Sequence, residues 1–554
     1  MSIFGVDYVL NCVGMKRFFV SLLVLLFLCV ASNSVLYGME VKEASDYGFA
    51  ASNDGDSNRK ALQAALDGGG HVEVSVPGTY NLAGTVFIDS DTELVFSKGV
   101  VINKCYSSNG TSAAYVFVNR GAYDRTYNEN IKISGLNIKM NGIDQGYDME
   151  PILGLMGNVS FFYVKNLEIT DFTTLDIGPM SFAIQICTFE NIRLERIHIE
   201  GRKDGIHLGR GSGFYLKDCK MRTYDDPIAL NAHDYIISNP ELGWLENGVV
   251  DNCTDLSAES TSGFFCRILA GSWIEWKEGM EVQNSDAVIS DGRIYRVHAE
   301  ADGKNYISRY KPVHLAGEKD YGDGIKWAMT QDKDVVNMCG VRNVTFKNIS
   351  LEKKRTTAFS IYFDNEAYSR SYYPYAESPV QRNFTFDGID QKADITALIF
   401  SVTPVDTIRI RNSIIRNGRL MFRRIEVPGC DYPPIYVELD NVLFCGDKDR
   451  LVLFENDYGL DINVVMNNCR TDRPELTILT DNVNVIRKSV SSVDDMEYYA
   501  ENNVIYIKCN EIRTVRVYDA SGKKVFEKKL GEGWHATSVL PDGVYIVNGK
   551  KILL

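Results

Sequence analysis

Three aspartates form the strongest candidate set for catalysis in this chain. Asp225 and Asp226 are adjacent in TYDDPIALNAHDY (223–235), where a buried strand is expected, and Asp204 lies in KDGIHLG (203–209). Adjacent carboxylates repel one another and cost stability unless they face water or have a use. Where three carboxylates meet, at least one should have a raised pKa, which is what a general acid needs.

The spacing of the two stretches explains how these acids could meet. Asp204 precedes Asp226 by 22 positions, and the same interval relates Ile206 to Ile228 and Leu208 to Leu230. If this interval makes one coil of a parallel β-helix, the two stretches are adjacent parallel strands about 4.8 Å apart. The acids would then lie together on the outer face.

A repeat through the middle of the chain supports that fold. Short alternating apolar stretches, each interrupted by a polar corner residue, return mostly every 22 to 40 positions, at 131–140, 159–170, 192–200, 213–223, 248–256, 344–352, 384–392, 408–417, 435–444 and 462–471. Hairpin turns such as Asn-Gly are not systematic between them, which argues against an antiparallel sandwich or barrel. The pattern predicts an all-β parallel β-helix.

Asparagines return at the predicted corners: Asn166, Asn252, Asn348, Asn412 and Asn468. Asparagine tolerates the left-handed backbone conformation that a tight corner requires. Stacked on neighbouring coils, their side-chain amides can hydrogen-bond along the helix axis.

The two ends of the repeat differ from its middle. Residues 58–67 predict an amphipathic helix, ended by Gly68–Gly70, which would cap the open strand edge. We expect the β-helix over 40–485 and a small C-terminal antiparallel β-sandwich over 486–554. Between 271 and 341 the repeat lapses, and we expect long loops and irregular coils.

The segment 1–38 predicts an N-terminal extension and a signal peptide. Met15-Lys16-Arg17 precedes an apolar run over 18–30 and then small and polar residues. The alternative is a membrane anchor, but the run is shorter than the roughly 20 residues that a span needs. We expect export to the periplasm, cell surface or medium, and no membrane span.

Charge and cysteine usage exclude other classes of function. Lys+Arg number 59 against 73 Asp+Glu, a net charge of -14, which argues against a nucleic-acid partner. The twelve cysteines form no CxxC pair and show no metal-ligand spacing with histidine. We therefore expect no metal, no cofactor, buried free thiols and a monomer.

The N-terminal segment from DYGFAASNDGDSNRKALQAALDGGG to TELVFSKGVVI resembles the start of pectin-lyase-like right-handed β-helix proteins, most closely the polygalacturonase-like glycoside hydrolases of family 28. The resemblance covers about 44–470 in architecture and 201–268 in specific motifs. The C-terminal VRVYDASGKKVF and LPDGVYIV resemble a type IX secretion sorting domain, although the basic finish of that pattern is absent.

The resemblance implies an inverting glycosidase acting on a carbohydrate. Asp225 corresponds to the general acid, and Asp204 and Asp226 to the pair that holds the attacking water. The alternative is that the Asp225–Asp226 pair is structural, since the turns of β-helices are rich in Asp.

Two departures from the family concern the residues expected to bind substrate. A Gly-His-Gly motif is replaced by Glu246-Asn247-Gly248, and an Arg-Ile-Lys motif by Arg267-Ile268-Leu269, which removes a uronate-binding lysine. His233 could replace the missing histidine, or it could be an incidental surface residue. Substitutes for the lysine are Arg202, Arg210 and Arg222. We predict His207, His233, Asn247 and Arg267 as substrate-binding residues.

Three of the five tryptophans, Trp244, Trp273 and Trp276, lie near one another in the chain soon after the acid pair. Indole rings stack on the apolar faces of sugars, so we predict these three as substrate-binding; the alternative is that they cover the core beneath long loops. The same region supplies Glu275, Glu278 and Glu281, which are either alternative acids or a solvated surface.

Two rival functions remain open. A polysaccharide lyase on the same fold would need a Lys or Arg base and usually a Ca²⁺ site, and only Lys203 is in register with the acids. A glycan-binding or adhesive β-helix would need no catalytic residue.

Overall fold

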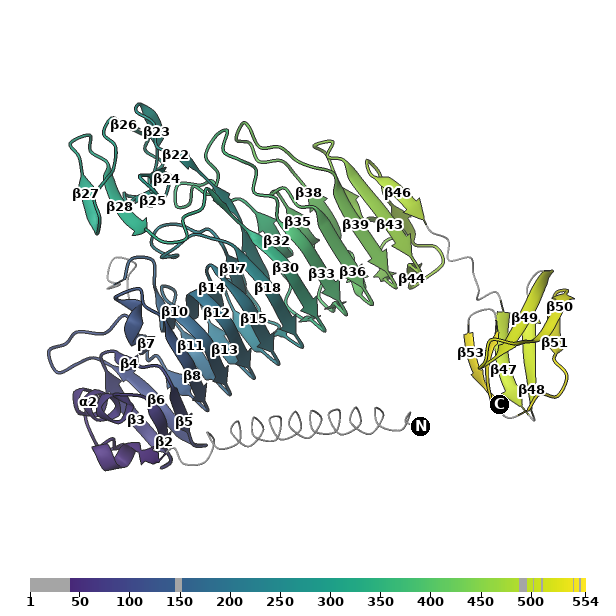
Figure 1. Ribbon diagram of the computed structural model, residues 1–554, viewed down its shortest axis with the longest axis horizontal. Coiled ribbons are helices and arrows are strands. Elements are labelled where there is room, and N and C mark those ends of the chain that lie inside the picture. The colour runs from purple at the N-terminus through teal and green to yellow at the C-terminus, as the bar shows by residue number, and fades with distance from the viewer. Residues whose placement is uncertain are drawn as a thin grey trace, which may run out of the picture.

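The computed structural model describes residues 40–144, 152–487, 496–501, 503–509, 512–541, 543–547 and 550–554. The predicted extension and signal peptide over 1–38 lie outside these residues. The regular secondary structure of the described chain is almost entirely strand, and the chain forms a right-handed parallel β-helix whose coils stack from the N-terminal cap to the C-terminal part (Figure 1).

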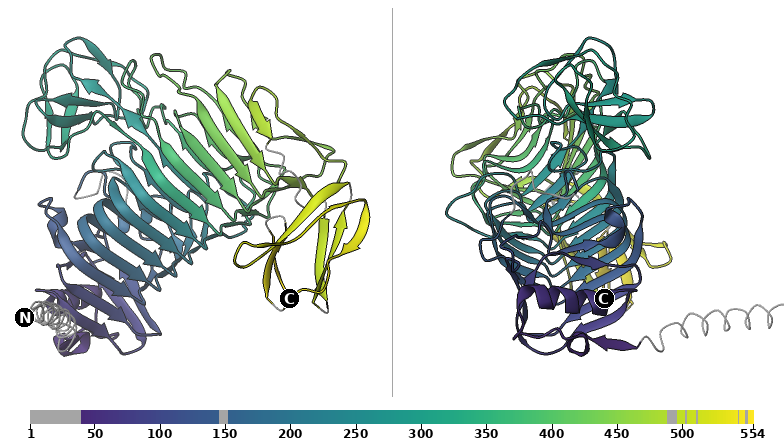
Figure 2. Two further views of the ribbon diagram at one scale, coloured as in Figure 1. Left: turned by 45° about the vertical axis from the view of Figure 1, so that its right-hand side comes forward. Right: turned by 90° about the vertical axis from the view of Figure 1, so that its left-hand side faces the viewer.

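The β-helix has three faces because long strands bend between two of them. The first half of β12 (Phe182–Glu195) pairs with β14 (Ile206–Leu208), and its second half pairs with β15 (Gly211–Lys217). The third face is a separate parallel sheet that runs from β3 (Gly78–Ala83) to β44 (Arg470–Thr471). Figure 2 shows the stacked strands from two further sides.

The strands that carry the acids have the predicted register. β14 pairs in parallel with β17 (Ile228–Asn231), with Ile206 opposite Ile228 and Leu208 opposite Leu230. All four of these side chains are fully buried. Each contributes roughly 1.5–3 kcal/mol by leaving water, so a slip of the register by one residue is strongly disfavoured. The prediction that Asp204 and Asp226 are one coil apart is confirmed.

The next strands of this face come from later in the chain. β17 pairs with β20 (Cys266–Leu269), which in turn pairs with β32 (Thr357–Tyr362). The site face is therefore β14, β17, β20 and β32 in order.

The predicted asparagine corners are confirmed. The five predicted residues all have φ between 47° and 54°. Asn412 shows the pattern, since its Nδ2 donates to Asp387 Oδ1 at 2.8 Å and its Oδ1 accepts from Asn441 Nδ2 at 2.8 Å. Each coil is thus tied to its neighbours at the corner.

The N-terminal cap is α2 (Gly55–Leu66), which begins earlier than the predicted Asn58. Asp54 is the reason, because its carboxylate accepts from the Ser57 backbone N–H at 2.8 Å and so caps the first turn. Gly55 is needed here because a Cβ at this position would lie 2.8 Å from Ala83 Cβ.

The prediction of irregular coils over 271–341 was wrong. This insertion contains a five-stranded sheet built from β22 (Ile274–Glu275), β24 (Ala287–Ser290), β25 (Arg293–Val297), β27 (Glu318–Asp320) and β28 (Lys326–Gln331). It has its own apolar core around Tyr295 and Trp327. Its hairpin strands are short and rich in charge, and they do not follow the spacing of the β-helix repeat. A search for that repeat therefore could not detect them.

The C-terminal strands form two antiparallel sheets. One is β47 (Met496–Glu501), β48 (Val504–Cys509) and β51 (Gly533–Ala536), and the other is β50 (Lys524–Leu530), β49 (Arg513–Asp519), β52 (Val544–Val547) and β53 (Lys550–Leu553). Their shared core includes Ile507, Val517 and Val547, as a small sandwich requires. The described cysteines form no disulfide bond, and Cys219 and Cys253 are buried. Among the described residues, no helix has the length and apolar character needed to cross a bilayer.

Candidate active site on the outer face of the β-helix

The backbone brings the three aspartates together at the entrance to β14 and β17. Gly205 N donates to Asp226 O at 2.9 Å, and Ile206 N donates to Pro227 O at 2.9 Å, so the ladder continues up to the acids. One carboxylate oxygen each from Asp204, Asp225 and Asp226 lies within 4.8 Å of the other two. Like charges at this spacing cannot all ionise without cost.

Asp204 is the member of the set whose pKa is lowered. It is buried, and its Oδ2 lies 3.0 Å from His207 Nδ1. Burial favours the neutral acid, but the hydrogen bond from His207 and the charge of Lys203 together hold the pKa of Asp204 below its ordinary value. The His207 ring stacks on Phe182 at 4.1 Å, which fixes its orientation.

Asp226 is the deepest of the three acids, with an exposure of 1%. Its Oδ1 accepts a hydrogen bond from Phe264 N at 2.6 Å. Burial, followed by the charges of Asp204 and Asp225, raises the pKa of Asp226 well above its ordinary value. This carboxyl therefore keeps its proton to a higher pH than an ordinary aspartate does.

Asp225 is the accessible member, with 28% of its side chain exposed. Burial and the neighbouring Asp204 raise the pKa of Asp225, and the ammonium of Lys203, 2.6 Å from Oδ2, partly offsets that rise. Of the three acids, it alone combines a raised pKa with access to a bound molecule.

A glycine lets the chain pass over the acids. Gly263 has φ +62, and a Cβ there would lie 2.4 Å from Asp226 Oδ1 and 2.7 Å from Asp225 Oδ1. Its position in STSGFF gives no local sign of this role, because the contact is made with the preceding coil.

Buried cations hold the turn that carries the acid pair. Arg355 Nε donates to Asp255 Oδ2 at 2.7 Å, and its Nη1 donates to Ser262 O at 2.7 Å. Lys353 Nζ donates to Thr223 O. Sequence reasoning missed both cations because they come from a coil much later in the chain than this turn.

Arg267 lies on β20, one coil beyond the acids. Its guanidinium is 2.6 Å from Asp364 Oδ2 and 3.7 Å from Asp234 Oδ1, and it lies over the Tyr362 ring at 5.9 Å. Burial raises the pKa of Asp364 to about 6, and Arg267 offsets part of that rise. The arginine is therefore engaged with two carboxylates.

His233 is completely buried, which excludes the surface-residue interpretation. Its ring centroid lies 6.0 Å from that of Trp273, which is also buried. Burial, with Arg296 and Arg267 nearby, lowers the pKa of His233 well below its ordinary value. Because Trp273 is covered, it offers no exposed face for a sugar.

The structure places Asn247, Trp244 and Trp276 away from the three acids. Asn247 lies on β18 (Leu245–Asp251), which pairs with β15 rather than with β17, and it forms a corner ladder with Asn343. The sequence comparison matched Glu246-Asn247-Gly248 to the family's Gly-His-Gly motif. In the structure the strand beside β17 is β20, so residues of β18 do not lie next to the acids. Trp244 lies under the Arg342 guanidinium, and Trp276 joins the core of the insertion.

Aromatic side chains do lie beside the acids, although they are not the tryptophans. Phe264, which holds Asp226 through its backbone, packs edge-to-face on Tyr362 with ring centroids 5.7 Å apart. Tyr224, next to Asp225, is exposed. No local signal marked Phe264, because its contacts with Asp226 and Tyr362 are made across neighbouring coils.

The arginines proposed as substitutes for the missing lysine are mostly engaged elsewhere. Arg210 contacts Glu241 at 3.4 Å and Asp334 at 3.0 Å, and Arg222 contacts Glu200 at 2.7 Å. Arg202 is exposed in the turn before Lys203. Glu275, Glu278 and Glu281 are exposed on the insertion.

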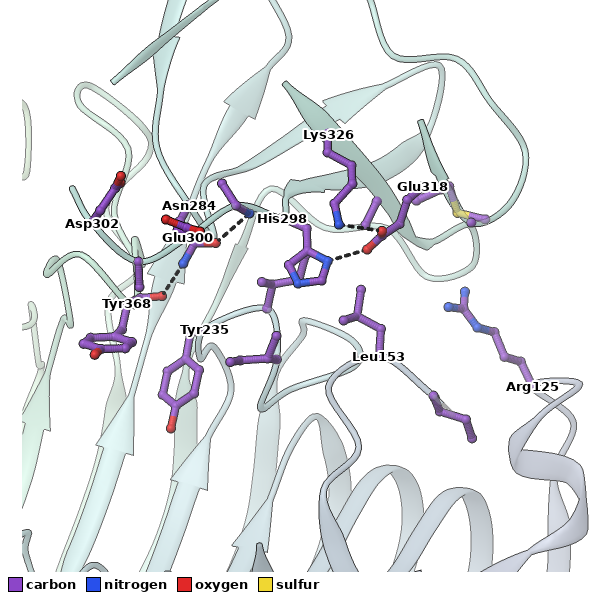
Figure 3. Close-up of a pocket in the computed structure, with 18 of the residues that line it drawn as sticks. Arg125, Leu153, Tyr235, Asn284, His298, Glu300, Asp302, Glu318, Lys326 and Tyr368 are labelled. Atoms are coloured by element: carbon purple, nitrogen blue, oxygen red, sulfur yellow. Dashed lines mark hydrogen bonds and ion pairs between the residues drawn. The ribbon is translucent and has the colours of Figure 1, made fainter. Parts of the chain in front are cut away.

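A cavity of about 1210 Å³ lies between the insertion and the N-terminal coils (Figure 3). Its wall includes Arg125, Tyr235 and Tyr368, and Lys326 Nζ contacts Glu318 Oε2 there at 3.0 Å. None of the three aspartates lines this cavity.

Three carboxylates this close could also bind a hard cation. Ca²⁺ takes six to eight oxygens at about 2.3–2.6 Å, and the three acids offer at most part of such a shell. The ammonium of Lys203, 2.6 Å from Asp225 Oδ2, opposes a cation at this position.

Comparison with known proteins gives a short sequence match and remote structural ones. No protein-family profile matches the chain. A polygalacturonase from Brassica napus is 37% identical over 76 residues, which are 13% of this chain and 19% of that protein. The chain therefore spans about a fifth of the length of that relative.

Solved structures with similar architecture include two carbohydrate-active proteins. The A-module of a mannuronan C-5 epimerase from Azotobacter vinelandii is 11% identical, with a TM-score of 0.43 over 80% of this chain and 99% of the module. A family 28 exopolygalacturonase from Yersinia enterocolitica is 12% identical, with a TM-score of 0.41 over 81% of this chain and 78% of that one.

Proposed function

We propose that the protein is a glycoside hydrolase whose catalytic residues are Asp204, Asp225 and Asp226. The observation that carries this proposal is the clustering of three carboxylates within 4.8 Å, of which Asp204 has a lowered pKa and the accessible Asp225 a raised one. Glycosidases use such a pair, with a protonated acid at the leaving oxygen and an ionised group on the attacking water. The polygalacturonase match supports the same class of reaction.

The roles follow from access and charge. Asp225 gives its proton to the glycosidic oxygen as the bond to the anomeric carbon breaks. Water attacks that carbon, and Asp204 takes one proton from the water. Asp226, buried and held by Phe264 N, orients the water. One proton leaves Asp225 and one arrives on Asp204, so proton transfer between these acids resets the site.

We propose inversion at the anomeric carbon. Two carboxylate oxygens that share one water through hydrogen bonds of about 2.8 Å lie roughly 4–5 Å apart, which fits the spacing of Asp204 and Asp226. Inverting enzymes more often keep acid and base about 6.5–9.5 Å apart, so the short spacing makes the product anomer a sharp test.

The lyase alternative lacks a suitable base among the described residues. The lysines whose pKa is lowered to about 8 are Lys104 and Lys353, and both are buried. Lys203 is in register with the acids but is paired with Asp225. An adhesive role would not require acids of divergent pKa beside one another.

The test is a screen of plant and host glycans with detection of new reducing ends, run on the wild type and on Asp225→Asn. Loss of a general acid costs typically about 10²–10⁴-fold, so we expect the variant to lose activity by that factor while keeping its melting temperature. A folded variant that cuts as fast as the wild type contradicts the proposal. Products that absorb in the ultraviolet would identify a lyase.

We also propose that the protein is exported, on the strength of the apolar run over 18–30. Detection of the mature N-terminus in the cell envelope or medium tests this, and an uncleaved chain inside the cell would contradict it.

A further inference from the structure

The charges around the three acids leave the site negative. The carboxylates here are those of Asp204, Asp225, Asp226, Asp234 and Asp364, and the lysine and arginine side chains that contact these carboxylates are Lys203 and Arg267. Even when Asp225 and Asp226, the two acids with raised pKa, both hold a proton, three negative charges face two positive ones. A negatively charged sugar at the cleaved bond would meet net repulsion.

Both cations are already engaged. Lys203 Nζ lies 2.6 Å from Asp225, and the guanidinium of Arg267 lies 2.6 Å from Asp364. Arg267 and Asp364 are both largely buried. Moving Arg267 to a substrate carboxylate would leave Asp364 as an unpaired buried charge, which is strongly unfavourable.

The polar atoms that lack a hydrogen-bond partner on this face include a hydroxyl oxygen and an amide oxygen. His207, Arg267 and Ser360 occupy one outward row of the sheet, because both His207 and Arg267 pair with Ala229 and Ser360 pairs with Arg267. His207 Nε2, Ser360 Oγ and the Arg267 Nε–H are buried without a hydrogen-bond partner among the described residues. Asn231 Oδ1, on β17, is also buried without a hydrogen-bond partner among the described residues.

Such atoms need hydrogen-bond partners, either water or a ligand's hydroxyls. The Arg267 Nε–H belongs to a charged group, and that charge is already paired with the carboxylates of Asp364 and Asp234. Beside this row, the rings of Phe264 and Tyr362 supply apolar surface of the kind on which sugar rings pack.

We propose that the sugar cleaved at this site is neutral, with hydroxyl groups rather than a carboxylate facing β14, β20 and β32. This inference rests on the proposed hydrolase function and names its substrate class.

Matched substrates give the test. One set of pairs is a uronate-containing polysaccharide and the same polymer after chemical reduction of its carboxylates. A second set is a p-nitrophenyl hexoside and the corresponding p-nitrophenyl hexuronide. Neutral polysaccharides complete the panel. We expect kcat/KM for the neutral member of the cleaved pair to exceed that for the uronate by at least about 100-fold, equivalent to about 2.8 kcal/mol. Asp364→Asn, which frees Arg267, should narrow that ratio about tenfold or more, whereas Glu366→Gln on the same loop should not.

The outcomes separate the two claims. Hydrolysis that favours the uronate member refutes the neutral-sugar inference and leaves the hydrolase function standing. No hydrolysis of any member by folded wild-type protein refutes the hydrolase function, and the inference that rests on it is refuted too.

Discussion

The ion pair between Lys203 and Asp225 should set the alkaline limit of activity. Lys203 favours the ionised form of Asp225, so replacing it by methionine removes a stabilising charge and makes the acid harder to deprotonate. A general acid works only while protonated, and activity is lost as the pH rises through its pKa. The Lys203→Met change should therefore move the alkaline limb of kcat/KM to higher pH.

The size of the shift follows from the geometry. Nζ and Oδ2 are 2.6 Å apart, which places the centres of charge roughly 4 Å apart, where the attraction is about 4 kcal/mol at an effective dielectric constant of about 20 and about 1 kcal/mol in water. Asp225 is 28% exposed and Lys203 14%, so solvent screens part of this energy. At about 1.36 kcal/mol for each pKa unit, we expect a shift of about 1 to 2 pH units.

The assay is a pH profile of kcat/KM on the best substrate from the glycan screen. Lys203→Arg keeps the charge and should leave the alkaline limb within about half a pH unit of the wild type. Arg202→Gln removes an exposed neighbouring charge and should also have little effect. If the acidic limb moves instead, Asp225 acts in its ionised form and our assignment of the acid is wrong. If neither limb moves, the titration of Asp225 does not control the reaction.

Three further predictions concern stability. The pKa of folded Asp226 is raised above that of the unfolded chain, so its protonation stabilises the fold fully below about pH 4 and less as the pH rises through the folded pKa. Asp226→Asn should therefore have a higher melting temperature than the wild type at about pH 7–8 and the same melting temperature at about pH 3.5. Equal melting temperatures at both pH values would contradict this. Asn412→Gly loses two ladder hydrogen bonds and should lower the free energy of unfolding in denaturant by about 1–2 kcal/mol. Asn412→Ala should lower it by about 1 kcal/mol more, because residue 412 has a left-handed backbone conformation that alanine disfavours. Equal losses in the two variants would exclude backbone strain. Arg267→Met leaves Asp364 unpaired and should cost about 3 kcal/mol, of which Arg267→Met/Asp364→Asn should recover a large part; no recovery would show that the ion pair is not the cause.

The repeat predicted the β-helix because the backbone of each coil depends on local alternation and on corner residues. The interval between KDGIHLG and YDDPIALN could be converted directly into a strand register, and the register brought the acids together. Asn412 and the other corner asparagines were likewise predicted from their residue type and their recurrence at the corners of the repeat.

What the sequence could not supply were contacts between distant coils. Gly263, Arg355 and Asp364 act on the acids or on Arg267 from coils whose lengths vary, so no fixed interval points to them. The tryptophans were misplaced for a related reason. Trp273 and Trp276 belong to the insertion. Trp276 packs against the insertion's own core, and Trp273 is buried in the core of the β-helix.

The configuration of the first product tests the central claim most directly. Hydrolysis followed by proton NMR at the anomeric position, on the wild type and on Asp225→Asn, reports both the chemistry and the residue responsible for it. Our account predicts that the newly formed sugar appears first with the anomeric configuration opposite to that of the substrate, and that Asp225→Asn forms it at least about 100-fold more slowly. Retention of configuration, an unsaturated product, or an undiminished rate in the variant would contradict it.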